Sequence, residues 1–192
     1  LALDQEARDT LLETAYEETE RMNRLVGNLL QMTRLEAGVI HVHKEPCDIE
    51  EVIGAALEQL GERIARRQVK VILPEDLPLV TLDMALFEQV LVNLLDNAVK
   101  YSEEAIEIAV SRAEGMTRIE VRDRGIGIPA EDLEHIFDKF YRVQRPERIT
   151  GTGLGLAICR GLVEVQGGRI EVQRRAGGGS IIVIDLPEED EA

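Results

Sequence analysis

The residues between positions 3 and 37 restrict the fold more than any other part of the sequence. They include no proline and one glycine, Gly27, and their apolar members recur with the period of an α-helix. Gly38 follows in the position where glycine commonly ends a helix. A helix of about 35 residues spans roughly 50 Å, which is more than a small globular domain needs for its own core. Its apolar stripe consists of Leu11, Ala15, Met22, Leu25, Leu29 and Met32.

A wide apolar stripe on so long a helix favours assembly with other helices. Such helices usually bury the stripe in a coiled coil or a four-helix bundle. Packing of the helix on its own domain remains the alternative. We therefore divide the chain into residues 1–38, one long amphipathic helix, and residues 39–192, a separate domain.

Residues 39–192 combine helix patterns with strand patterns. A helix is predicted after Asp48, which forms a capping box with Glu51, and another runs from Asp83 to about Tyr101. A last helix is predicted from Leu154 to a glycine pair. Strands are predicted at 69–73, 106–110, 119–121, 169–174 and 180–186. This pattern is typical of an α+β fold, a two-layer sandwich in which one mixed sheet packs against helices.

The stretch from Arg124 to Gly155 is glycine-rich and polar. It is too long for an ordinary connection, and loops of this length are usually functional. One short helical segment is predicted within it, starting at Pro129 and including Phe137.

The charge of the chain narrows the class of ligand. Its 192 residues include 22 Lys and Arg against 37 Asp and Glu, a formal net charge of −15. This excess argues against nucleic acid as a partner, because nucleic-acid binding needs a cationic surface. A local group of cations or a helix N-terminus can still hold a phosphate in an acidic protein. Cys47 and Cys159 have no metal-ligand spacing.

Three short motifs carry the residue types of a phosphate-binding site, and the first is NLLDNAVKYS. Its Asn93, Asn97 and Lys100 lie four and three residues apart, so they share one helix face, with Tyr101 beside them. Two amide oxygens one turn apart suit a hard cation, and a lysine suits phosphate oxygens. Taken alone, the motif is more often an ordinary polar helix face.

The second motif, EVRDRGIGIP, ends a predicted strand. Asp123 has the same parity as Ile119 and Val121, so it lies on the buried face and needs a hydrogen-bond donor. A ligand amino group would serve, and Gly125 and Gly127 permit close approach of the backbone. The alternative is an aspartate that caps its own turn.

The third motif, GTGLGLAI, precedes a predicted helix. Gly151, Gly153 and Gly155 alternate up to the helix N-terminus, where free N–H groups and the helix dipole suit a phosphate. The motif lacks the lysine of a P-loop and the strand that precedes a GxGxxG turn. By itself it is weak evidence.

In this order and spacing, the motifs resemble those of the histidine kinase family, whose ATP-binding domain belongs to the superfamily of gyrase, the mismatch-repair ATPases and a heat-shock chaperone. NLLDNAVKYS resembles the N box, DRGIGI and GTGLGLAI the two glycine boxes, and FDKFYR the F box. The segment ERMNRLVGNLLQMTRLEAG resembles the second helix of the dimerisation and histidine-phosphotransfer hairpin, so residues 1–38 would be an incomplete hairpin. Within the family, the chain is most similar to the potassium-responsive sensor kinases.

The resemblance implies a role for each polar residue of the N box. Asn97, assisted by Asn93, would coordinate Mg²⁺ on the triphosphate of ATP. Lys100 and Tyr101 would contact the phosphates. Arg142, together with Lys100, would offset the charge that develops on the γ-phosphate during transfer.

The resemblance also implies how the base and the rest of the nucleotide are held. Asp123 would accept a hydrogen bond from the adenine amino group, which would select ATP over GTP. The glycines would be hinges of a lid, and Lys139 and Arg145 would join the cations around the triphosphate. The remaining positions of the implied nucleotide site are Gly125, Gly127, Phe137, Lys139, Gly151, Thr152, Gly153, Leu154 and Gly155.

The implied function is that of the catalytic ATP-binding domain of a sensor histidine kinase. Such an enzyme transfers the γ-phosphate of ATP to a histidine, for relay to an aspartate on the receiver domain of a response regulator. The implied partners are that receiver domain, the phosphoacceptor helix of the parent kinase and a second copy of the parent. The domain would be cytoplasmic, in a parent anchored in the inner membrane.

The phosphoacceptor histidine itself is not found in the sequence. The family's acceptor is typically followed by Glu or Asp, whereas His41, His43 and His135 are followed by Val, Lys and Ile. His41 and His43 are expected on a short strand or its edge. Because the chain also starts at Leu1, we expect a fragment of a longer kinase that binds Mg-ATP but does not phosphorylate itself.

Three other functions remain possible for this sequence. A gyrase or mismatch-repair type of ATPase would need a glutamate where Asn93 stands, and an amide has no useful basicity. An anti-sigma-factor serine kinase would share the ATP site, but the helix from Leu11 to Met32 disfavours it. A nucleotide-binding module without activity is the third possibility.

Overall fold

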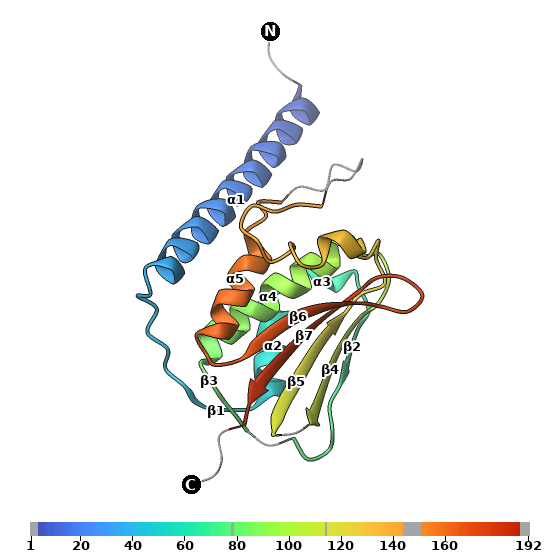
Figure 1. The fold of residues 1–192 in the computed structure, drawn as a ribbon. Helices are drawn as coiled ribbons and strands as arrows, with labels where there is room; N and C mark the ends of the chain where they lie inside the picture. Colours follow the sequence, from blue (N-terminus) through green and yellow to red (C-terminus); the bar gives the residue numbers. More distant parts are fainter. Residues whose placement is uncertain (1–3, 78, 114, 144–150, 189–192) are drawn as a thin grey trace.

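A computed structural model describes residues 4–77, 79–113, 115–143 and 151–188 of the chain. The first element is the long helix α1 (Gln5–Glu36), which extends well beyond the two-layer domain that follows it (Figure 1). The Asp4 carboxylate caps α1 by accepting a hydrogen bond from the Ala7 N–H at 2.7 Å. Gly38, with φ of +63°, follows the helix end, as the sequence predicts.

The domain contains a five-stranded mixed sheet in the order β2-β4-β5-β7-β6. Strand β2 is parallel to β4, and the other neighbouring pairs are antiparallel. This confirms the predicted fold class and all five predicted strands. The strands are β2 (Val69–Ile72), β4 (Ile106–Ala113), β5 (Met116–Arg122), β6 (Arg169–Arg174) and β7 (Ser180–Pro187).

A second, two-stranded sheet pairs β1 (Glu45–Cys47) with β3 (Val80–Leu82) in antiparallel register. Both strands have three residues, too few to show a hydrophobic period, and the sequence did not predict either of them. His41 and His43, expected on a short strand or its edge, are not part of a strand. They precede β1 in irregular chain, because the His43 N–H donates to the Asp83 carboxylate, at 2.9 Å, instead of joining a strand ladder.

The helices cover one face of the larger sheet (Figure 1). They are α2 (Ile49–Leu60), α3 (Glu62–Ala65), α4 (Met84–Tyr101) and α5 (Gly155–Glu164), with one 3₁₀ turn η1 (Ala130–Asp132). The helical segment predicted from Pro129 is therefore shorter than expected and stops before Phe137. After η1 the backbone hydrogen bonds mostly reach back three residues, so turns replace a continuous helix.

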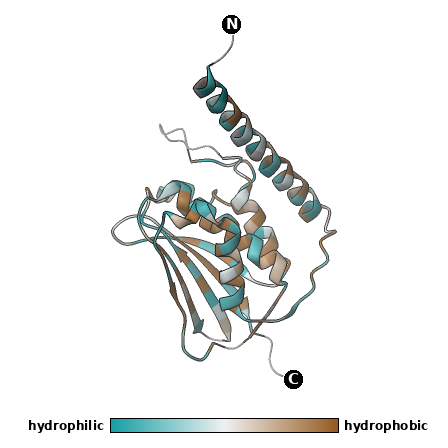
Figure 2. Cartoon of the chain, turned by 180° about the vertical axis from the view of Figure 1, so that it is seen from behind, coloured by the Kyte–Doolittle hydropathy of each residue, from teal (hydrophilic) through white to brown (hydrophobic). Residues whose placement is uncertain are grey.

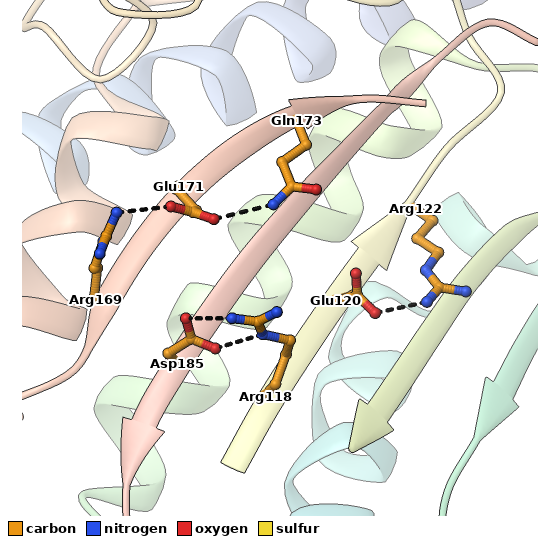
Figure 3. A network of polar contacts seen from close by, with 7 residues as sticks. All are labelled: Arg118, Glu120, Arg122, Arg169, Glu171, Gln173 and Asp185. Atoms are coloured by element: carbon orange, nitrogen blue, oxygen red, sulfur yellow. Dashed lines mark hydrogen bonds and ion pairs between the residues drawn. The ribbon is translucent and has the colours of Figure 1, made fainter. Parts of the chain in front are cut away.

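The opposite face of the sheet is polar. Alternate residues of β5 are buried, and charged residues between them form ion pairs within β5 or with the adjacent strand (Figure 3). Arg118 makes two hydrogen bonds to Asp185 of β7, at 2.7 and 3.0 Å, and Arg122 makes one to Glu120, at 2.6 Å. Because water covers these pairs, they define the outside of the sheet more than they stabilise it.

The C-terminal part of α1 packs on the domain, while its N-terminal part extends away from it (Figure 1). Gln31 exchanges hydrogen bonds of 2.6 Å with Gln89 of α4. Leu35 lies over Gly161 of α5, where an added Cβ would come within 2.8 Å of the Leu35 side chain. Hydrophobic and hydrophilic residues alternate along the whole helix (Figure 2), and Leu11 and Leu12 are 55% and 60% exposed.

Candidate functional site

A cavity of about 1040 Å³ lies between α4, the adjoining ends of β5 and β7, the segment before α5, and one face of α1. Its size is at the upper end of the range for small-molecule sites. Most of the residues selected from the sequence are brought together here. The cavity is lined by Asn93, Asn97, Lys100, Tyr101, Asp123, Gly127, Arg142, Gly151, Thr152, Gly153 and Gly155.

Four of the selected residues do not line the cavity. Phe137 and Leu154 are buried in the core, and the Arg160 guanidinium stacks on the Phe137 ring at 5.1 Å. Gly125 lies against the end of α4. The Lys139 ammonium pairs with the carboxylate of Glu36 on α1.

Arg145, which was also expected near the triphosphate, lies outside the described residues.

Helix α4 positions the two asparagines by burying its other face. Leu91, Leu94 and Leu95 are fully buried in the core, which turns Asn93 and Asn97 toward the cavity. The buried amide nitrogen of Asn93 has no hydrogen-bond partner of normal geometry among the described residues. This nitrogen belongs to the inner side of the residue, where Asn93 interacts with the buried Cys159 thiol and opposes the rise that burial causes in the thiol pKa.

The donor set fits Mg²⁺ held together with a polyphosphate. Asn93 and Asn97 offer amide oxygens one helical turn apart, and Mg²⁺ binds oxygen ligands while keeping several waters or substrate oxygens. Among the described residues, no group of three or more His, Cys, Asp or Glu side chains could hold a metal by itself. The cation would therefore depend on the phosphates as well as on these amides.

Lys100 lies in an unusual electrostatic environment. Its ammonium and the guanidinium of Arg63 both pair with the carboxylate of Asp96. Burial is the largest of the effects that lower the pKa of Lys100 to about 8, and the positive charges of Arg63 and Arg24 contribute to the same shift. The single carboxylate of Asp96 thus does not balance the cations around it, and an anionic ligand would.

Asp123 terminates β5 and is almost completely buried, as its parity predicts. Its Oδ1 accepts a hydrogen bond from the Gly125 N–H at 2.7 Å, and its Oδ2 accepts one from the Ser180 hydroxyl at 2.6 Å. A carboxylate has about four acceptor positions, so lone pairs remain for a ligand donor. Asp123 therefore caps its turn and can still receive an amino group.

The cavity around Asp123 has apolar walls suited to a flat ring. They are formed by Val121, Ile128, Ile136 and Ile182. An apolar slot with one acceptor at its end suits a heteroaromatic base with an exocyclic amine.

In the segment before α5, Gly153 occupies a position that no other residue could fill. Gly153 has φ of +71°, and its missing Cβ would lie 2.6 Å from the carbonyl carbon of Phe140. The Phe140 N–H donates to the Gly153 carbonyl at 2.9 Å, so the F-box segment and the second glycine box are bonded to one another. No side chain caps the N-terminus of α5, which leaves N–H groups for a phosphate.

Ser180 is not among the residues that the sequence motifs indicated, although the register of the sheet places it beside Asp123. Arg122 pairs with Ile181, and the Asp123 N–H donates to the Ser180 carbonyl at 3.0 Å. The motifs likewise did not indicate the cavity residues of α1 and of the α2–α3 region, which are Arg21, Arg24, Leu25, Asn28, Gln59 and Arg63. Arg21, Arg24 and Asn28 share a helix face, but nothing in the sequence indicates that this face meets the domain.

Comparison with known families gives the same assignment. Residues 83–190, more than half of the chain, match the model of the family described as histidine kinase-, DNA gyrase B-, and HSP90-like ATPase.

Several curated sensor proteins are similar over most of this chain. The sensor protein KdpD of Clostridium acetobutylicum is 37% identical over 97% of the chain, and KdpD of Escherichia coli is 42% identical over 86%. The sensor histidine kinase WalK of Bacillus subtilis is 37% identical over 91%. The chain spans 21%, 19% and 30% of these three proteins, respectively.

Solved structures of histidine kinases share the fold. Full-length ShkA in complex with AMPPNP superposes with a TM-score of 0.80, at 27% identity, over 98% of this chain and 40% of that one. The Acinetobacter baumannii histidine kinase AdeS gives a TM-score of 0.77, at 25% identity, over 99% of this chain and 88% of that one.

Within the described residues, no helix has the length and apolar character to cross a membrane.

The fold and the cavity agree with these comparisons and confirm the resemblance that the motifs indicated. The chain belongs to the histidine kinase-, DNA gyrase B- and HSP90-like ATPase family, and within it to the catalytic ATP-binding domains of sensor histidine kinases.

Proposed function

We propose that this chain binds Mg-ATP in the cavity described above and transfers the γ-phosphate to a histidine of its parent kinase, for relay to an aspartate of a response regulator. One observation carries the proposal. A single cavity joins an acceptor with spare lone pairs, Asp123, to a group of amides, cations and a free helix N-terminus. A nucleoside triphosphate has the complementary order of groups, since an amine-bearing base lies at one end and phosphates at the other.

At the base end, Asp123 accepts the hydrogen bond of the adenine amino group. Ser180 and the Gly125 N–H hold the carboxylate in place, because each occupies one lone pair and fixes the carboxyl plane. A guanine base would present a carbonyl oxygen to the same carboxylate, and two acceptors repel. Asp123 is therefore the residue that selects ATP.

At the phosphate end, the chain supplies positive charge and hydrogen-bond donors. Asn93 and Asn97 hold Mg²⁺, which when bound neutralises phosphate oxygens and favours transfer. Lys100 and Arg142 stabilise the negative charge that develops on the γ-phosphate. Tyr101, whose hydroxyl lies beside Gly151, contacts the phosphates from the end of α4.

Transfer to a protein group is favoured over hydrolysis. A hydrolytic enzyme of this superfamily would use a glutamate one helical turn before the metal-binding asparagine. Asn93 occupies that position in α4, and its amide cannot take a proton from water.

The acceptor histidine belongs to another segment of the parent. Among the described residues that line the cavity there is no histidine. His135 instead makes a 2.9 Å contact with Asp138. We therefore propose that the parent supplies the acceptor helix, that α1 pairs with this helix in a homodimer, and that a membrane anchor of the parent leaves this domain in the cytoplasm.

Calorimetric titration with Mg-ATP tests the binding site. We expect binding by the 192-residue chain and a loss of roughly tenfold or more in affinity for Asn97→Ala, since a metal ligand is removed. Asn23→Ala is the matched control, because Asn23 is exposed on α1 away from the cavity. Absence of Mg-ATP binding by the unmodified chain would refute the proposed function.

Incubation with γ-labelled ATP tests the phosphate transfer. We expect no acid-labile label on this chain alone, and label on the acceptor histidine when the parent kinase is used. Acid-labile label on the chain alone would show that one of its own histidines is the acceptor.

A further inference from the structure

The cavity extends beyond the nucleotide motifs to a wall of basic residues. Arg24 of α1, Arg63 of α3 and Lys100 of α4 all line it. They come from three separate elements, and neither Arg24 nor Arg63 belongs to the N box, the F box or the glycine boxes. We call these three residues the basic wall.

The basic wall carries more positive charge than its neighbours neutralise. Among the described residues, the cavity is lined by five Lys or Arg side chains and by three carboxylates, although acidic residues predominate in the whole chain. Of the three carboxylates, Asp123 lies at the base end and Asp96 already pairs with both Arg63 and Lys100. Glu88 is the third.

The three side chains of the basic wall lie close enough to influence one another. The charges of Arg63 and Arg24 both disfavour the protonated form of Lys100, in spite of its contact with Asp96. Like charges held together in a partly buried site are unfavourable unless an anion joins them. The site is therefore built for a ligand with more than one negative charge.

We propose that the basic wall is the subsite for the terminal phosphates of a nucleoside triphosphate, and that Arg24 of α1 contacts these phosphates directly. The inference rests on the proposed function, because it extends the ATP site toward α1. Its basis is position, since Lys100 shares a helix face with Asn93 and Asn97, so the phosphates that pass the asparagines reach Lys100 and then Arg24 and Arg63.

The proposal has a consequence for the position of α1. The helix is held to the domain by the Gln31–Gln89 amide pair, by Leu35 over Gly161 and by the Glu36–Lys139 ion pair. A ligand that contacts Arg24 only when α1 is packed on the domain stabilises this packing. Conversely, any change that moves α1 away from the domain weakens ATP binding by the same factor. ATP binding thus stabilises the packing of α1 on the domain, whereas AMP, which lacks the terminal phosphates, does not.

Calorimetric titration of Arg24→Gln with ATP, ADP and AMP, each with Mg²⁺, tests the subsite. We expect roughly tenfold weaker ATP binding, which corresponds to the loss of one charge-assisted hydrogen bond, and AMP binding unchanged within about twofold. Arg8→Gln removes the same charge from an exposed position of α1 that does not line the cavity, and should leave all three affinities unchanged. Arg63→Gln should have the same effect as Arg24→Gln, with weaker ATP binding and unchanged AMP binding.

Three outcomes would overturn the inference. They are unchanged ATP affinity of Arg24→Gln, equal weakening of ATP and AMP, and binding of inorganic phosphate alone that depends on Arg24 while ATP binding does not. If the unmodified chain fails to bind Mg-ATP at all, the proposed function fails first. Hydrogen exchange supplies a second measurement, since ATP, but not AMP, should slow exchange in the part of α1 from Arg21 to Glu36.

Discussion

Gly125→Ala should destabilise the domain and weaken nucleotide binding, because the glycine is packed against the end of α4. An added Cβ would lie 1.9 Å from the carbonyl oxygen of Tyr101 and 2.6 Å from its carbonyl carbon. These are backbone atoms, so no side chain can rotate away. The chain around residue 125 must move by more than 1 Å to restore an ordinary contact of about 3.4 Å.

This movement breaks two hydrogen bonds that the structure shows. One is the bond of 3.3 Å from the Ile126 N–H to the Tyr101 carbonyl, and the other is the bond of 2.7 Å from the Gly125 N–H to the Asp123 carboxylate. A neutral bond contributes about 1 kcal/mol and a bond to a charged group about 2 kcal/mol. We expect the free energy of unfolding to fall by about 3 kcal/mol, and Tm by about 6–12 °C for a chain of this size.

Gly54→Ala is the matched control for this prediction. Gly54 lies inside α2, and an added Cβ there meets nothing within 4 Å. The same methyl group should therefore raise the free energy of unfolding by about 0.5–1 kcal/mol through helix propensity.

Thermal unfolding and ATP titration of both variants provide the assay. Gly125→Ala should also bind ATP more weakly, since Asp123 loses the N–H that orients it. Equal stability of Gly125→Ala and the unmodified chain would refute the reasoning from close approach.

The other predictions concern the polar and titratable groups of the domain. Asp123→Asn replaces a carboxylate acceptor by an amide, so ATP affinity should fall by roughly tenfold or more and the preference for ATP over GTP should decrease. An unchanged ratio of ATP to GTP affinity in competition titrations would contradict this prediction. Because burial lowers the pKa of Lys100 to about 8 and a bound phosphate favours its charged form, ATP binding at pH 8.5 should take up a proton and weaken toward pH 10. Calorimetry in two buffers of different ionisation enthalpy measures this proton uptake, which Lys100→Arg should abolish. The charged groups around Lys100 are Asp96, Arg63 and Arg24. Absence of proton uptake by the unmodified chain would contradict the prediction. Burial raises the pKa of Cys159 to about 12 and also raises that of Cys47, so neither thiol should react with a disulfide reagent until the chain unfolds, and prompt reaction of the native chain would disagree.

Local patterns predicted the elements that local forces determine. The Asp83 carboxylate caps α4 through the Leu86 N–H, at 3.1 Å, and the period of the leucines turns Asn93 and Asn97 outward. Both features depend on residues within one or two turns, so the sequence contains them completely. The parity of Asp123 along β5 predicted its burial for the same reason.

Features that depend on register could not be predicted in this way. Ser180 reaches Asp123 only because β7 pairs with β5 in one particular alignment, 57 residues away in the chain. A shift by one residue would turn Ser180 to the other face of the sheet. The two three-residue strands β1 and β3 are likewise defined by their pairing, since neither has a period of its own.

The position of α1 depends on contacts that no helical pattern contains. Its amphipathic stripe is compatible with many packing arrangements, and the observed one is selected by side chains such as Gln31, whose partner lies 58 residues further on. This packing takes Lys139 to Glu36 instead of to the cavity, and brings Arg24 to the cavity instead. A net charge of −15 describes an average over the whole molecule, whereas electrostatic attraction of a phosphate depends on charges within about one Debye length. An acidic chain can therefore form a cationic site when its tertiary structure gathers a few basic residues from distant elements.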